Sequence, residues 1–217
     1  MKNDEKIIRN ILESLKDKLV SKRQLEISFR DVLQTKYSDN IIVNLRKNKD
    51  ILYIFKGYYY LLDPKEKIGS YTYYSTNEMV YAILNKLNIK WYLGLYSALE
   101  RNNIIWQGVV NPIILNSSIS GEKNILGIKY QFHKIKRQLL GFGSIKKTTK
   151  NRITFYYSNP EKTFIDFLYF NKNPPFELTD FKKNKKTRDY LKNYSKNFKK
   201  KVLYSWTLLI LRSIHPM

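Results

Sequence analysis

The fold is decided by residues 21–64, which read SKRQLEISFRDVLQTKYSDNIIVNLRKNKDILYIFKGYYYLLDP. Ser21 is a favourable helix N-cap, and Gln24 follows three residues later, where a capping box needs a glutamine or glutamate. Ser38 introduces a second apolar periodicity of period 3.6. The stretch therefore predicts two helices joined by a short turn.

A tight hairpin is predicted directly after the second helix. Residues 51–55 and 58–62 are β-branched and aromatic runs, separated only by Lys56 and Gly57. Glycine allows the positive φ that a two-residue turn requires. Upstream, residues 5–18 carry apolar side chains at the spacing of a core-facing helix. Three helices followed by a basic-tipped hairpin are the pattern of a winged helix-turn-helix, a module that reads DNA.

Composition narrows the class of protein. The 217 residues are 43% hydrophobic and 15% aromatic, which excludes wholesale disorder and allows one large domain or two small ones. Zero cysteines exclude disulfides, thiol catalysis and thiolate zinc sites. Residues 1–6 are charged, unlike a signal peptide, and the longest apolar run, 202–211, is too short to span a membrane. We expect a cytoplasmic protein with no membrane partner.

The formal charge of +22 is the second global signal. Such an excess attracts polyanions and makes their binding depend strongly on salt. A compositional bias of the genome toward lysine and asparagine is an alternative source of the same excess. Within residues 182–201, nine lysines and Arg188 face a single acid, Asp189. This run is either a dock for an anionic partner or a solvated helix with its aromatic residues packed inward.

The expected fold class is α+β, with a winged helix-turn-helix domain at residues 1–63 and a mixed α/β domain at residues 64–217. The second domain should hold a small, mostly antiparallel sheet and end in a basic helical extension, 171–217. Its predicted helices and β-like runs are as follows: helices at 76–87 (capped by Thr76), 91–102, 160–170, 187–198 and 200–213, and β-like runs at 104–106, 109–110, 112–115, 125–133 and 153–157. The run Lys146–Arg152 is expected to be an exposed basic loop.

Eight residues are predicted to contact DNA. Asparagine pairs bidentately with adenine and arginine with guanine in the major groove, whereas lysine and arginine hold phosphates without reading sequence. The base-facing candidates lie on or beside the exposed face of the second of these two helices, and the others lie at its partner helix and the hairpin tip. The set is Lys22, Arg23, Gln24, Asn40, Asn44, Arg46, Lys47 and Lys56. The alternative is a winged helix used for protein interaction, with these residues as an ordinary solvated face.

Catalytic patterns are nearly absent. His133 and His215 are the only histidines and stand far apart, so no metal-binding cluster is predicted, and no phosphate-binding glycine loop occurs. Glu161 and Asp166 lie five residues apart on one helix and would diverge. We expect Asp166 to make a hydrogen bond or salt bridge. No cofactor and no catalytic residue are predicted.

Three segments carry a resemblance to a known family. They are residues 57–64 (GYYYLLDP), 92–105 (YLGLYSALERNNII) and 158–166 (SNPEKTFID). In their order and spacing they resemble the abortive-infection type IV antitoxins, which are AbiEi-like transcriptional regulators. The last segment is similar to that family's Ser-Pro-Glu-Arg-Thr-Leu-Leu-Asp pattern, with Lys162 in place of arginine. The resemblance covers roughly residues 5–170.

The resemblance implies a division of labour between the two domains. The first would bind inverted repeats in its own promoter, and the second would counter a nucleotidyltransferase-like toxin. We therefore expect a non-enzymatic, autoregulating antitoxin whose partners are double-stranded DNA and a cognate toxin. The alternative is a nucleic-acid-processing enzyme, such as a nuclease, with an N-terminal winged helix. Loss of cleavage on changing a carboxylate such as Asp166 would favour that alternative.

Overall fold

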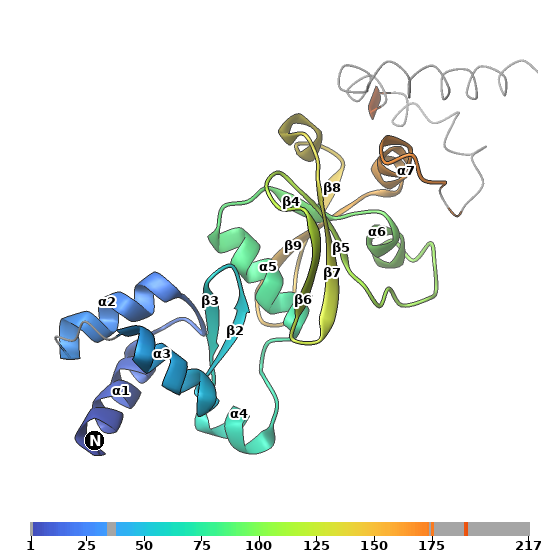
Figure 1. Cartoon of the computed structure of the whole chain (residues 1–217). Helices are drawn as coiled ribbons and strands as arrows, with labels where there is room; N and C mark the ends of the chain where they lie inside the picture. The colour runs from blue at the N-terminus through green and yellow to red at the C-terminus, as the bar shows by residue number, and fades with distance from the viewer. Residues whose placement is uncertain (1, 34–37, 174, 176–188, 191–217) are drawn as a thin grey trace, which may run out of the picture. The chain divides into compact units, whose positions relative to one another are not determined.

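The computed structural model describes residues 2–33, 38–173, 175 and 189–190. Within these residues the protein is a mixed α+β structure with seven α-helices, one 3-10 helix and two β-sheets (Figure 1). Two compact units are distinguished: unit 1 comprises residues 1–87 and 150–153, and unit 2 comprises residues 88–149 and 154–217. The helices expected at 187–198 and 200–213 lie outside the described residues, apart from residues 189 and 190. Among the helices that are described, none is long and apolar enough to cross a membrane.

Unit 1 contains the helices and the hairpin expected from the sequence. Its elements are α1 (Lys2–Ser14), β1 (Leu19–Ser21), α2 (Lys22–Leu33), α3 (Ser38–Lys47), β2 (Ile51–Phe55), β3 (Tyr58–Leu61), α4 (Pro64–Gly69) and α5 (Thr76–Lys86). The strands form an antiparallel sheet in the order β1-β3-β2. Apolar side chains of the first three helices pack on this sheet around the buried Leu25, Phe29 and Leu45. The first helix begins and ends earlier than the predicted 5–18.

Local signals at the start of α2 and at the hairpin are confirmed. Gln24 Oε1 accepts a hydrogen bond from Ser21 N at 2.8 Å, and Gln24 N donates to Ser21 Oγ at 3.2 Å, which is the reciprocal pattern of a capping box. At the hairpin turn Lys56 and Gly57 have φ of +53° and +75°. Two consecutive positive φ values are those of a type I′ turn, whose twist matches that of the flanking strands.

The boundary expected between residues 63 and 64 falls inside unit 1. Asp63 instead caps α4 through a capping box with Glu66. The Glu66 carboxylate is fully buried and accepts hydrogen bonds from the Tyr60 hydroxyl and Lys18 Nζ. The polar composition of residues 65–70 therefore does not mark a domain boundary, because one of its charged residues, Glu66, is buried in the interior of unit 1. The compact unit continues to residue 87.

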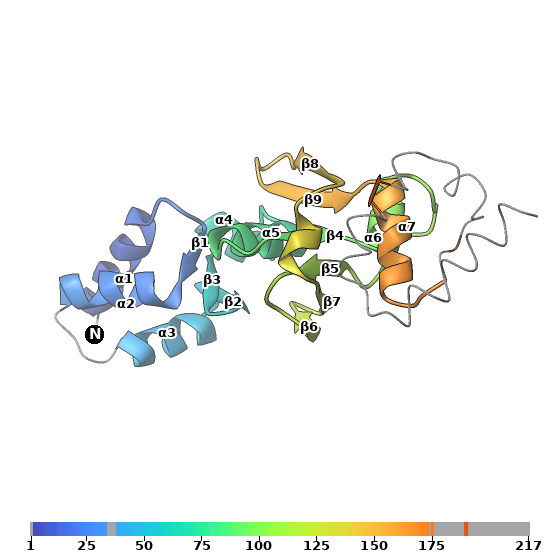
Figure 2. The same ribbon diagram turned by 90° about the horizontal axis from the view of Figure 1, so that it is seen from above.

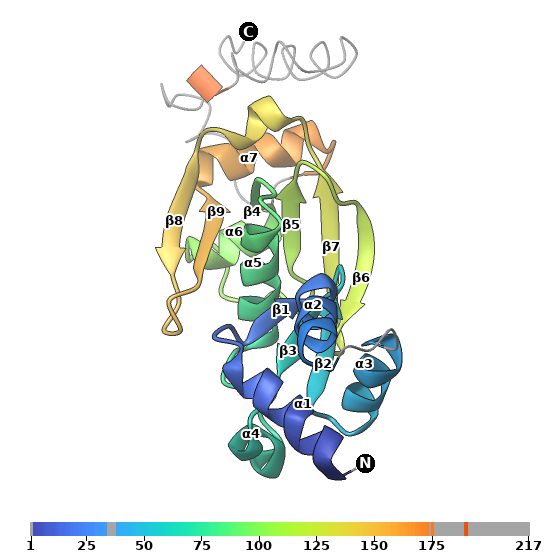
Figure 3. The ribbon, with the colours of Figure 1, turned by 90° about the vertical axis from the view of Figure 1, so that its left-hand side faces the viewer.

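Unit 2 is built on a six-stranded mixed sheet. Its elements are β4 (Trp91–Leu93), α6 (Tyr96–Arg101), β5 (Ile113–Asn116), β6 (Gly121–Ile125), β7 (Ile128–Lys134), the 3-10 helix η1 (Arg137–Leu140), β8 (Ser144–Thr148), β9 (Thr154–Ser158) and α7 (Pro160–Tyr169). Figure 3 shows the strand order β6-β7-β5-β4-β9-β8. The β5–β7 and β4–β9 pairs are parallel and the other three are antiparallel. Helices α6 and α7 lie on the same face of the sheet (Figure 2).

The prediction of a helix at residues 91–102 is wrong over its first half. Trp91–Leu93 is the strand β4, whose three side chains are all buried. Gly94 follows, and a Cβ at this position would lie 2.6 Å from Leu115 Cδ1, so the Leu115 side chain would have to shift to admit a larger residue. Leu95, with φ of +52°, then redirects the chain into the short helix α6. A sheet position between two neighbours therefore overrides the helical periodicity.

Other differences concern strands and one cap. Residues 104–106 and 109–110 were expected to be β-like, but they lie in the loop between α6 and β5. The run 125–133 forms parts of two strands, because Leu126 and Gly127 adopt positive φ and turn the chain. Residues 146–148 of the expected basic loop belong to the edge strand β8, where exposed lysines discourage edge-to-edge association. Ser75, one residue before the expected Thr76, caps α5.

Candidate nucleic-acid interface

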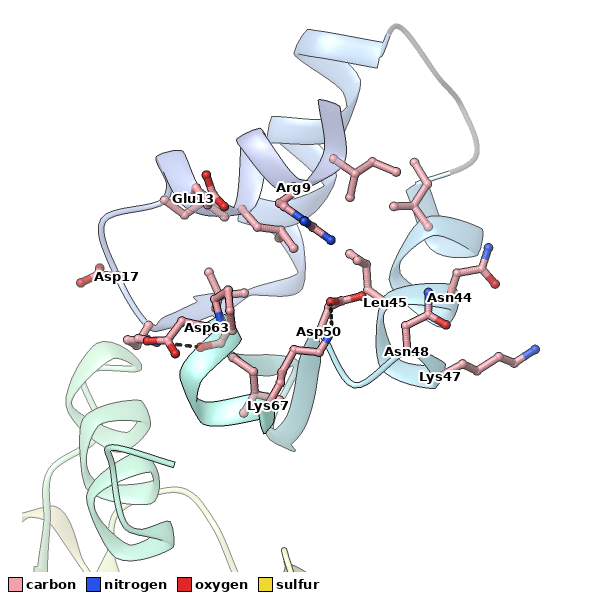
Figure 4. A pocket seen from close by; sticks show the side chains of 18 of the residues that line it. Arg9, Glu13, Asp17, Asn44, Leu45, Lys47, Asn48, Asp50, Asp63 and Lys67 are labelled. Atoms are coloured by element: carbon pink, nitrogen blue, oxygen red, sulfur yellow. Dashed lines mark hydrogen bonds and ion pairs between the residues drawn. The ribbon is translucent and has the colours of Figure 1, made fainter. Parts of the chain in front are cut away.

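The exposed face of α3 carries most of the residues predicted to contact bases. Ile42 and Leu45 bury the opposite face, as the apolar pattern predicted. Positions 40, 43, 44 and 47 recur at the spacing of one helical face and are all exposed. In Figure 4, Asn44 and Lys47 extend from the same side of α3, while Leu45 points from the other side toward Arg9. The α3 face therefore carries two carboxamides, one ammonium and the aliphatic side chain at position 43.

Arg46 does not share this face. It follows the buried Leu45, and a step of one residue turns about 100° around a helix, which takes it away from Lys47. Its guanidinium carbon lies 5.7 Å from the centroid of the Tyr53 ring on β2. Tyr53 is 44% exposed, so this cation–π contact forms at the surface, where it contributes about 0.5–1 kcal/mol. Arg46 is thereby held at the side of α3 that adjoins the hairpin.

The hairpin tip and the start of α2 are brought together by the sheet. Ser21 pairs with Tyr58 at the end of the β1–β3 ladder, and the backbone N–H of Lys22 donates to the Gly57 carbonyl at 2.7 Å. Arg23 and Lys56 are both exposed next to this connection. Two basic side chains that are far apart in the sequence thus gather at one end of the sheet.

Two of the eight predicted residues are occupied by contacts within the protein. Lys22 Nζ lies 2.8 Å from Asp39 Oδ1 and 3.4 Å from Glu26 Oε1. The hydrogen bond to Asp39, followed by that to Glu26, raises the pKa of Lys22 above its ordinary value. The negative charges of Asp39 and Glu26 offset the positive charge of Lys22 with which a DNA phosphate would have to pair. The carboxamide oxygen of Gln24 accepts the hydrogen bonds from Ser21 that cap the helix. Gln24 is therefore better explained as a helix-capping residue than as a DNA-binding residue.

Three residues were missed by sequence reasoning. Val43 stands on the α3 face and is 45% exposed, and Tyr53 supports Arg46 from the hairpin. Asp39, in the first turn of α3, neutralises Lys22. The helical spacing of Val43 from Asn40 and Lys47 was available in the sequence. The other two contacts join different elements, and no local pattern announces them.

A hollow of about 870 Å³ lies beside α3 in the same unit (Figure 4). Its walls come from α1, α3 and the segment around α4, with an apolar floor that includes Leu12 and Leu45. The charged groups at its rim have both signs and several pair with each other: Lys67 Nζ lies 2.6 Å from Asp50 Oδ1. Because these charges already compensate, the hollow selects no ligand of one sign. Asn44 and Lys47 of the α3 face also line this hollow.

Polar groups of unit 2 converge in its interior rather than at its surface. Lys162 and Asp166 are fully buried on α7, with Nζ 3.3 Å from Oδ1, and the Tyr92 hydroxyl donates to Asp166 Oδ2 at 2.9 Å. The expected hydrogen-bonding and salt-bridging role of Asp166 is confirmed. His133 is half-buried in β7 with its ring 5.2 Å from that of Phe170, and burial lowers its pKa.

The described residues contain no group of three or more histidine, cysteine, aspartate or glutamate side chains placed to hold a metal ion. No protein-family model matches the chain, and no curated protein matches it either.

Proposed function

We propose that unit 1 is a winged helix-turn-helix that binds double-stranded DNA through α3 and the tip of the β2–β3 hairpin. The observation that carries the proposal is the α3 face, where Asn40, Asn44 and Lys47 stand exposed together. The connection from α2 through the β1-β3-β2 sheet sets basic side chains at the hairpin tip. A helix for the major groove with a flanking basic hairpin matches the docking geometry of helix-turn-helix proteins. The charge of +22 supports a polyanionic partner.

We further propose that the protein is an autoregulating antitoxin that counters a nucleotidyltransferase-like toxin through unit 2. The support is the sequence resemblance over residues 57–64, 92–105 and 158–166. Asp166 is fully buried and bound to Lys162 and Tyr92, which favours this proposal over a nuclease that uses its carboxylate. Unit 2 would then act through its surface, and charge complementarity with an acidic partner would speed encounter.

DNA binding is tested by gel retardation of the full-length protein on the DNA upstream of its own gene. Replacing Asn44 and Lys47 together with alanine should lower the preference for that DNA over random sequence. Lys56→Ala should weaken binding to all DNA and reduce the slope of log affinity against log salt by about 1, because it removes one phosphate contact. Lys65→Ala is the matched control, since Lys65 is exposed in α4, beyond the opposite end of β3. A folded protein that binds its upstream DNA no better than a neutral protein does would disprove the proposal.

Toxin neutralisation is tested by co-expression with the product of the adjacent gene. The full-length protein should restore growth, and the Asn44 and Lys47 double variant should restore it equally, because unit 2 carries the activity. Rescue that disappears with these two side chains would mean that the protein acts by repression alone. Absence of rescue by the wild-type protein would contradict the antitoxin proposal and leave the DNA-binding proposal to its own test.

A further inference from the structure

The α3 face differs from an ordinary basic DNA-binding face in its chemistry. Its four residues comprise two asparagines, one valine and one lysine: Asn40, Val43, Asn44 and Lys47. A carboxamide donates to and accepts from the N7 and N6 edge of adenine, and an aliphatic side chain packs against the C5-methyl group of thymine. Three of the four side chains therefore suit the two bases of an A·T pair. Lys47, at the C-terminal end of α3, is the one that can approach guanine or a phosphate.

The structure also removes the other guanine readers from this face. Arginine is the side chain that most often reads guanine, through its two parallel N–H donors. Arg46 is turned to the flank, where its guanidinium lies 5.7 Å from the ring centroid of Tyr53. Arg23 lies at the start of α2, beside the hairpin tip. Both positions suit phosphates on either side of a groove, so they add charge complementarity without adding guanine recognition.

Val43 is the residue of the α3 face that indicates most specifically which bases this face contacts. Val43 is 45% exposed, and an apolar side chain at the surface gains nothing from water. Along α3 it lies between Asn40 and Lys47, about one turn from each. A thymine methyl group is the one apolar feature that the major groove presents.

We propose that α3 reads A·T base pairs, with Asn40 and Asn44 on adenine edges and Val43 against a thymine methyl group. The inference rests on the proposed DNA-binding function and names the sequence class that it prefers. The recognised site should therefore have A·T pairs at the centre of the contact with α3, and G·C pairs should be tolerated only where Lys47 points.

The first experiment selects binding sites for the full-length protein from a pool of random-sequence duplexes. Enrichment of consecutive A·T pairs is expected, and enrichment of G·C pairs at the centre would overturn the inference while leaving DNA binding intact. Selection of no sequence at all would instead remove the proposed sequence-specific function, and the inference with it. The two failures are thus distinguishable.

The second experiment tests the methyl contact on the selected duplex. Replacing each thymine in turn with uracil removes only the C5-methyl group, and at one position the wild-type protein should lose about fourfold in affinity. Val43→Ala should bind the thymine and uracil duplexes equally. Val110→Ala is the matched control, because Val110 is 84% exposed in the loop before β5 of unit 2, and it should keep the wild-type ratio. Equal affinity of the wild-type protein for every thymine and uracil duplex, or a ratio that survives in Val43→Ala, would overturn the contact.

The third experiment tests the carboxamides. Replacing a central adenine with 7-deazaadenine removes the N7 acceptor and should weaken wild-type binding, whereas the variant that lacks the contacting asparagine should not respond. Asn44→Ala and Asn40→Ala should each reduce discrimination of adenine from guanine at one position by about tenfold. Full discrimination retained in both variants would overturn the assignment.

Discussion

Glu66 in unit 1 and Asp166 in unit 2 are both fully buried carboxylates, but the protein compensates their charges in different ways. Glu66 accepts hydrogen bonds from the Tyr60 hydroxyl, the backbone N–H groups of Asp63 and Tyr73, and Lys18 Nζ. The side chain of Lys18 remains 29% exposed, so this cation is only partly removed from water. The donors come from several chain segments of unit 1. This explains why α4 is part of the same compact unit as the preceding sheet.

Asp166 is instead compensated by a lysine that is itself fully buried. Lys162 stands one turn earlier on α7 and also lies 4.8 Å from the ring centroid of Tyr92 and 4.7 Å from that of Phe142. Burial lowers the pKa of Lys162 below its ordinary value, and the neighbouring Asp166 offsets this only in part. For Glu66, burial acts to raise the pKa, but the hydrogen bonds from Lys18, Tyr60 and the backbone outweigh it, so the pKa is lowered. The first site favours its charged form, whereas the second disfavours the charge on its lysine.

The largest effect is expected for Lys162→Met, which leaves the buried charge of Asp166 without its cation. Unit 2 should lose about 3–5 kcal/mol of unfolding free energy. Urea denaturation followed by tryptophan fluorescence reports this unit, because unit 1 contains no tryptophan. The double variant Lys162→Met with Asp166→Asn removes both charges, keeps an acceptor for Tyr92 and should recover most of the loss. A single variant as stable as the wild type would show that the pair is dispensable.

Glu66→Gln should destabilise unit 1 by about 2–3 kcal/mol. The amide NH₂ replaces one acceptor oxygen, so it faces donors that then lose their partner in the interior. Hydrogen exchange of the amides of β1 and β3 should accelerate accordingly. Glu13→Gln, at an exposed position of α1, is the control and should leave exchange unchanged. If both variants behave alike, the donors around Glu66 do not stabilise the unit.

Alanine substitution at two glycines distinguishes the free-energy cost of backbone strain from the cost of a steric clash. Gly143 has φ of +66° and Gly57 has φ of +75°, so alanine is strained at both, by about 1–2 kcal/mol. A Cβ at Gly143 would also lie 2.7 Å from Lys162 Cδ, whereas nothing lies within 4 Å of one at Gly57. Gly143→Ala should therefore destabilise unit 2 by about 1–3 kcal/mol more than Gly57→Ala destabilises unit 1. Hydrogen exchange in each unit measures the two losses of unfolding free energy. Equal losses would mean that the Lys162 side chain moves aside at no cost in free energy.

The smallest effects appear in the pH dependence of stability. The lowered pKa of Glu66 means that its contribution is present above the ordinary value of 4.5 and is lost as pH falls through the folded pKa. For Lys162 the unfolded chain binds the proton more tightly, so the stability of unit 2 should rise as pH increases toward 10.5. Denaturation across pH should show the acid loss shrinking in Glu66→Gln and the alkaline rise disappearing in Lys162→Met. A rise that persists in Lys162→Met would assign it to another group.

Features that depend on neighbouring residues were predictable from the sequence. The capping box at Ser21, the turn at Lys56 and Gly57, and the start of α7 at Pro160 all appear where the sequence places them. The exposed face of α3 also follows from spacing alone, because burial of Leu45 fixes the orientation of the helix. Each signal lies within a few residues of the structure that it specifies.

Features that depend on distant partners were predicted poorly. Residues 91–93 lie at the start of a predicted helix yet form a strand between β5 and β9, and the polar segment after Asp63 contains a buried carboxylate. Among the DNA-binding candidates, spacing could not reveal that Asp39 engages Lys22 or that Tyr53 holds Arg46 aside. These contacts join side chains from different elements, and their formation depends on how the sheets assemble.

The sequence by itself determined the order of α1, α2, α3 and the β2–β3 hairpin, the amide-rich face of α3 and the excess of positive charge. Those properties follow from local dihedral preferences, helical periodicity and composition. Only the tertiary structure decided which charges stay available at the surface and which are consumed inside. That choice depends on desolvation, because Glu66, Lys162 and Asp166 leave water only when segments far apart in the chain close around them.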